Sequence, residues 1–224
     1  MKRSFRYLWQ FTAVNLMVIA AFAAVLPVLT VVVGGETNPQ PGAGNMVATY
    51  FGMFPLMAVI IVFLLATNLS TINLDMAVSM GGRRQDYFRG MQVAFAAYAL
   101  TCWGLSLVLT RIPGWLNWPD PEQWRMLLSL GNQPWWWYPL ICMTAAAAGA
   151  VCGMLLVRHK VLAVFFLAAA ALLGVASVVF LMLSTFNSIY LWGDMHRIIP
   201  GLLAAVLVIC EGVLWRYIKG YCVR

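Results

Sequence analysis

The chain has 224 residues, of which 63% are hydrophobic and 9% are charged, and its formal net charge is +7. A soluble domain carries about 25% charged residues, so this chain has too few polar groups to cover a surface in water. The composition excludes a soluble protein and indicates a single integral membrane domain, residues 1–224. Its positive charges are spread between apolar blocks and form no basic stripe, so nucleic acid is not expected as a partner.

Six apolar segments are long enough to be transmembrane helices, because about 20 apolar residues cross a hydrocarbon core of about 30 Å. A cleaved signal peptide is the rival interpretation of the first segment, but its apolar region should be only about 7–15 residues long. The sequence therefore predicts an all-α integral membrane protein with spans over about 9–33, 46–67, 91–110, 136–157, 161–183 and 198–214.

The segments between the spans carry local signals. The first six residues hold three cations, which predicts a basic amphipathic lead-in at an anionic inner leaflet. Asp120, Pro121 and Gln123 form a cap, a first-position proline and a capping-box partner, which predicts a short outer helix over 121–130. The segment 184–200 is semi-polar and suits a re-entrant or surface-lying helix.

The distribution of positive charge predicts the orientation. Six spans place both termini on one side, and the positive-inside rule assigns the side richer in Lys and Arg to the cytoplasm. We therefore expect a multi-pass membrane protein with both termini cytoplasmic. The eleven basic residues on that side are Lys2, Arg3, Arg6, Arg83, Arg84, Arg89, Arg158, Lys160, Arg216, Lys219 and Arg224, against Arg111, Arg125 and Arg197 on the other.

The segment 68–90 is the longest polar interruption that is also rich in positive charge. Ser70 is a candidate N-cap, and Gly81 and Gly82 form a candidate helix stop. The segment predicts a short cytoplasmic helix between the second and third spans, and an ordinary cytoplasmic loop is the alternative. Three arginines follow the glycines: Arg83, Arg84 and Arg89.

This short helix has an apolar stripe. Ile72, Met76 and Met80 fall at helical spacing, whereas Asp75 and Ser79 lie on other faces. A stripe of this kind is suited to contact with a partner protein.

The search for catalytic motifs returns little. The chain has no phosphate-binding loop, no nucleophile elbow and no zinc-binding helix motif. His159 and His196 are expected at opposite membrane surfaces, so they cannot share a metal, and the five cysteines suit small buried packing residues. We expect neither an enzyme nor a metal site.

Two features within the spans remain as candidates. Glu211 is the one acidic residue placed inside a span, and it either reaches the inner interface or belongs to a transport pathway. Ala145, Gly149 and Gly153 recur at four-residue intervals, which allows close approach of two helices within one chain or between two chains.

The loop sequence A-V-S-M-G-G-R-R-Q-D-Y-F-R-G, residues 77–90, resembles the loop after the second span in small permeases of the type-2 ABC exporter family. Gly82 departs from that loop, because a small hydroxyl or aliphatic residue is more usual there. The matching residues are Ser79, Gly81, Arg83, Arg84, Tyr87 and Phe88.

The resemblance implies that the loop helix is a coupling helix, which docks in a groove of a separate ATPase subunit. ATP and Mg would then be bound by that subunit, and two permease chains, identical or different, would pair with two ATPases. The exported substrate would be amphipathic, such as an antimicrobial peptide, a drug or a lipid. The coupling residues would be Ile72, Asp75, Met76, Met80, Gly81, Gly82, Arg83 and Arg84.

Other classes remain open. A substrate-binding membrane component of an energy-coupling-factor vitamin importer has a similar size, and Ala20 and Ala24 resemble its docking motif. Such a component does not need an amphipathic loop after the second span. A membrane enzyme would need acidic or histidine clusters that this sequence lacks, and a stand-alone channel or sensor is the remaining alternative.

Overall fold

The computed structural model describes residues 2–34, 46–79, 83–109, 111, 135–171 and 192–220. These residues form seven helices and no strand, so the predicted all-α fold is confirmed over the described part of the chain. In chain order the helices are α1 (Lys2–Gly34), α2 (Met46–Ser70), α3 (Ile72–Ser79), α4 (Arg84–Leu109), α7 (Trp137–Arg158), a helix over Lys160–Ala171, and α9 (Trp192–Lys219).

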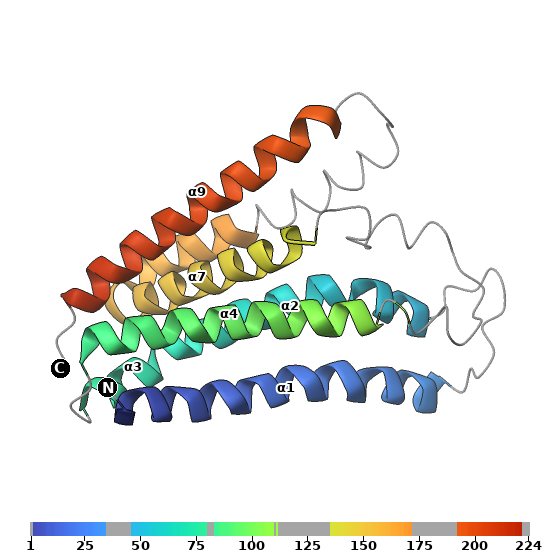
Figure 1. The fold of residues 1–224 in the computed structure, drawn as a ribbon, viewed down its shortest axis with the longest axis horizontal. Coiled ribbons are helices and arrows are strands. Elements are labelled where there is room, and N and C mark those ends of the chain that lie inside the picture. Colours follow the sequence, from blue (N-terminus) through green and yellow to red (C-terminus); the bar gives the residue numbers. More distant parts are fainter. Residues whose placement is uncertain are drawn as a thin grey trace.

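The long helices form one bundle (Figure 1). Helices α1, α2 and α4 run side by side, and α7 packs against both α2 and α4. Helix α9 crosses the others at an angle, and it contacts α7 and, near its last residues, α4. The start of α1, helix α3 and the end of α9 lie at the same end of the bundle, which we call the base.

Within the described residues, four helices contain a segment long and apolar enough to cross a membrane: Leu8–Val25 of α1, Arg84–Leu109 of α4, Trp137–Arg158 of α7 and Pro200–Lys219 of α9. Shorter apolar segments cover Phe54–Ser70 of α2 and the helix Lys160–Ala171. Residues 172–183 of the expected fifth span and the expected outer helix over 121–130 lie outside the described residues. Six complete spans therefore stay a prediction.

Helix boundaries differ from the expectation at two places. The basic lead-in is the first turns of α1, which continues without a break to Gly34. Residues 192–200 of the semi-polar segment are the start of α9, with Pro200 inside the helix, and residues 184–191 lie outside the described part.

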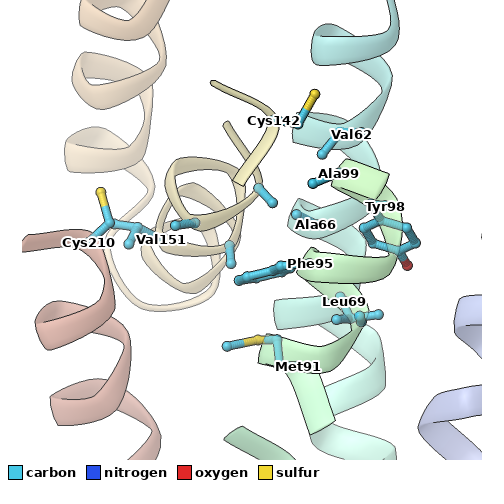
Figure 2. Packing of buried hydrophobic residues seen from close by; sticks show 14 of the residues in the cluster. Val62, Ala66, Leu69, Met91, Phe95, Tyr98, Ala99, Cys142, Val151 and Cys210 are labelled. Atoms are coloured by element: carbon cyan, nitrogen blue, oxygen red, sulfur yellow. The ribbon is translucent and has the colours of Figure 1, made fainter. Parts of the chain in front are cut away.

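The core lies where α2, α4 and α7 meet, and Figure 2 shows its side chains between these helices. Phe95 and Tyr98 of α4 are fully buried there, together with small side chains that let the helices approach. Tyr138 of α7 donates a hydrogen bond of 3.0 Å to the carbonyl of Pro55 in α2. Interdigitated large and small side chains fix the spacing of the three helices.

Candidate functional site

The junction between α2 and α3 is the first part of the candidate site. Only Thr71 separates the two helices, and its hydroxyl lies 3.2 Å from the carbonyls of both Thr67 and Asn68. The Ser70 hydroxyl donates to the Thr67 carbonyl at 2.9 Å. Ser70 therefore ends α2, and the expectation that it caps the following helix is wrong. The reason is that its hydroxyl bonds backwards to the Thr67 carbonyl in the last turn of α2.

Helix α3 has one buried and one exposed face. Leu74 and Ala77 are buried against the bundle, whereas Met76 is 45% exposed. Asn73 is also buried, and its Oδ1 atom has no hydrogen-bond partner. The short helix is thus fixed along its inner face and presents Met76 outward at the base.

Only some of the other predicted coupling residues lie in the described part of the chain. Ile72 and Asp75 belong to the α3 backbone, and their side chains lie outside the description, as do Met80, Gly81 and Gly82 altogether. Arg83 is exposed and Arg84 is partly exposed at the start of α4. Of the three residues expected in the apolar stripe of α3, only Met76 has a described side chain, and it is exposed.

A buried tyrosine ties α4 to the end of α2. The Tyr87 hydroxyl donates a hydrogen bond to the carbonyl of Leu69, and both residues are fully or almost fully buried. Because the last carbonyls of a helix have no partner within it, this bond satisfies one of them. It also connects the two long helices that flank α3.

Two arginines hold the end of α9. Arg84 Nη1 lies 2.9 Å from the carbonyl of Lys219, and Arg158 Nη2 lies 3.1 Å from the carbonyl of Gly220. The Arg158 guanidinium also lies 5.2 Å from the centre of the Tyr217 ring. Cationic donors suit a helix C-terminus, where unpaired carbonyls carry partial negative charge. Arg84, predicted as a coupling residue, therefore connects the start of α4 to the end of α9.

Helices α4 and α9 meet along an antiparallel seam of three pairs, each one helical turn from the next. The pair nearest the base is the hydrogen bond between Arg84 and Lys219. One turn further, the rings of Phe88 and Trp215 contact edge to face, with centroids 5.1 Å apart. The third pair is Gln92 and Glu211, described next. Side chains four residues apart share a helix face, so the three pairs have one register.

Glu211 bonds within the bundle. Gln92 Nε2 donates a hydrogen bond to Glu211 Oε2, whereas Glu211 Oε1 is buried and has no hydrogen-bond partner. Glu211 lies eight residues before Lys219, which is about 12 Å along a helix that rises about 1.5 Å per residue. Gln92 was not singled out from the sequence. The sequence did contain an indication of its role, because Gln92 is a polar residue within the apolar part of α4.

The predicted small-residue stripe lies on α7, and two of its glycines face α2. A Cβ atom on Gly149 would lie 2.2 Å from the Phe63 carbonyl oxygen, and one on Gly153 would lie 2.2 Å from Ser70 Oγ. Thr67 Oγ1 donates to the Gly149 carbonyl at 3.0 Å. The glycines therefore serve contact within the chain. Ala145, the third member, is partly exposed.

Metal and thiol chemistry find no support in the described residues. No group of three or more His, Cys, Asp or Glu side chains in that part of the chain is placed to hold a metal ion. Cys102, Cys142, Cys152 and Cys210 are free and buried, as expected for packing residues.

Comparison with known proteins adds no relative, since no family model, no curated protein and no solved structure matches the chain. The fold defines the class only broadly: an α-helical bundle with four helices long and apolar enough to cross a membrane, which is compatible with a membrane protein.

Proposed function

We propose that the chain is the transmembrane permease subunit of an ATP-driven ABC exporter in a bacterial cytoplasmic membrane. The observation that carries the proposal is helix α3, which is buried along Leu74 and Ala77 and exposes Met76 at the base. A short helix with a fixed inner face and an apolar outer residue is suited to the groove of a partner subunit. ATP and Mg bind to that partner, an ATPase, and a second permease chain completes the pathway.

The contacts around α3 suit the transmission of a movement. Thr71 alone joins α3 to α2, and the Tyr87 hydroxyl ties α4 to the end of α2. Arg84 connects the start of α4 to the end of α9. A displacement of α3 by the ATPase therefore moves the bases of three long helices together. The partner shifts the equilibrium between two arrangements only by its differential affinity for them.

The cargo in this proposal is an amphipathic molecule such as a peptide, a drug or a lipid. Exposed apolar side chains on α1 and α9 are suited to contact with lipid, and an amphipathic molecule can reach such a surface from the bilayer.

The test is co-expression of the chain with an ATPase that carries a Walker phosphate loop and is encoded beside it. We expect the ATPase to co-purify with the chain, and we expect Met76→Asp to abolish both co-purification and ATP-dependent transport. Gln85→Asp adds the same charge at an exposed position in the first turn of α4 and should preserve both. Retention of both activities in Met76→Asp would reject α3 as the docking element.

An importer component is the second candidate, favoured by one observation. Ala20 and Ala24 are exposed on α1 and leave a small-residue face open to a scaffold subunit. Co-purification separates the two proposals. An ATPase that binds the chain directly supports the exporter, whereas a membrane scaffold bound through α1 supports the importer. In the importer case, Ala20→Leu should abolish assembly and Met76→Asp should preserve it.

A further inference from the structure

The third pair of the α4–α9 seam leaves a carboxyl oxygen without a partner. Gln92 satisfies Glu211 Oε2, and Oε1 is buried with no hydrogen-bond donor near it. A buried polar atom is costly unless it is paired. Along the seam, Arg84 is two helical turns away and donates to the Lys219 carbonyl. The described residues thus satisfy one of the two oxygen atoms of this carboxyl group.

The turn of α9 that carries Glu211 has an open side. Gly212, the next residue, has no atom within 4 Å of the position of a Cβ, so α9 faces open space at Gly212. Val208 and Ile209, on the preceding turn, are 69% and 64% exposed. An elongated apolar chain can therefore lie along this face of α9.

An aromatic ring lies one turn closer to the base. Trp215 is 37% exposed and is held by its edge-to-face contact with Phe88. A carboxylate and an indole ring within one helical turn form the combination that attracts an ammonium group, through charge pairing and through cation–π interaction. Neither group attracts an anion or a neutral headgroup in this way.

We infer that Glu211, Gln92 and Trp215 form a binding site for the ammonium head of an amphipathic cationic molecule. The ammonium group donates to Glu211 Oε1, Gln92 holds the carboxyl group in place through Oε2, and Trp215 covers the cation on the side of the base. The apolar tail lies on the exposed face of α9. The identification of this molecule as cargo rests on the proposed function, whereas its binding does not.

The test is carbodiimide labelling of the purified full-length chain in lipid nanodiscs, without nucleotide or ATPase. Dicyclohexylcarbodiimide reacts with carboxyl groups in apolar surroundings, and mass spectrometry of peptides measures the modification of Glu211. We expect labelling of the ligand-free chain. Octylammonium at about ten times its binding midpoint should reduce the labelling rate about tenfold, because about one site in eleven stays free. Neutral 1-octanol should leave the rate unchanged.

Two variants separate recognition from folding. Trp215→Leu should raise the octylammonium midpoint about fivefold by removing the cation–π partner, and Trp215→Phe should restore most of the affinity. Trp136→Leu removes an exposed tryptophan at the opposite end of the bundle and should leave the midpoint unchanged. Helix content by circular dichroism should be equal in all three variants.

Several results would overturn the site. Equal protection of Glu211 by octanol and octylammonium would show that the ligands bind through their apolar chains and that the charge is not recognised. Failure of the carbodiimide to label Glu211 in the ligand-free chain would show that the carboxyl group is inaccessible. Unchanged affinity in Trp215→Leu would remove the ring from the site. None of these results bears on α3, so the site and the exporter proposal fail independently.

Discussion

Gln92 and Glu211 are 119 residues apart in the sequence and hydrogen-bond to each other where α4 crosses α9. The bond belongs to the same register as the Arg84–Lys219 and Phe88–Trp215 contacts. The seam therefore consists of a hydrogen bond from a guanidinium to a backbone carbonyl, an aromatic pair and a pair of polar side chains. The polar pair is the farthest from the base, and one of its oxygen atoms is unsatisfied. Its contribution to stability is therefore testable separately from any ligand.

Removal of one member of this pair should destabilise the chain more than removal of both. Gln92→Leu leaves Glu211 Oε2 without a donor in a partly buried site, which costs about 1–3 kcal/mol. The double variant Gln92→Leu with Glu211→Leu replaces both groups by apolar side chains and should be nearly neutral. Thermal unfolding in one detergent gives the stability of the unchanged chain, of Gln92→Leu, of Glu211→Leu and of the double variant. Additive losses in the double-mutant cycle would show that the two side chains do not interact.

The glycines of α7 give a sharper stability test. Gly149→Ala places a Cβ 2.2 Å from the Phe63 carbonyl oxygen, so α2 and α7 must separate. We expect a loss of about 1–3 kcal/mol, which is the usual cost of overpacking, and a fall in melting temperature of about 2–4 °C for each kcal/mol.

The matched control is Gly104→Ala, on α4. No atom lies within 4 Å of its added Cβ, and alanine favours a helix over glycine by about 0.5–1 kcal/mol. The melting temperature should stay the same or rise. An equal loss at both positions would show that close approach of α2 and α7 is not the cause.

The arginines at the end of α9 should act locally. Arg158→Ala removes the donor to the Gly220 carbonyl and the cation above the Tyr217 ring. Arg158 is exposed, so the global effect should stay below about 1 kcal/mol. Hydrogen exchange of the last turn of α9 should become faster, because the helix end frays. Lys160→Ala is the control: it removes a neighbouring exposed cation and should leave that exchange unchanged.

The spacing of apolar residues along the sequence predicted the helices but not the contacts between them. Long apolar runs predicted where α1, α4 and α7 lie, because the apolar period of a helix is a property of a short stretch of sequence. The spacing of Gly149 and Gly153 indicated a close helix contact, but it could not identify α2 as the partner. The pairing of Gln92 with Glu211 depends on how α4 and α9 pack in the bundle, and a local sequence pattern does not predict it.

Helix ends were also hard to predict. Ser70 is as suitable for an N-cap as for the end of a helix, and the structure shows that its hydroxyl bonds back to Thr67. The sixth span was expected to begin near residue 198, whereas α9 begins at Trp192. Element ends are the part of a helix that a local sequence pattern defines least well.

The Tyr87 hydroxyl gives a test of coupling that leaves α3 itself unchanged. Tyr87→Phe removes the hydrogen bond to the Leu69 carbonyl and should cost about 0.5–1.5 kcal/mol. If the chain is the exporter permease proposed above, loss of this bond between α4 and the end of α2 should lower transport per ATP hydrolysed while the ATPase still binds. Tyr98→Phe is the control, since Tyr98 is also buried on α4 and its hydroxyl lies 2.7 Å from Asn15 Nδ2. It should lower stability by a similar amount and leave the transport ratio unchanged. An equal fall in that ratio for both variants would assign the effect to general destabilisation of α4 rather than to the link beside α3.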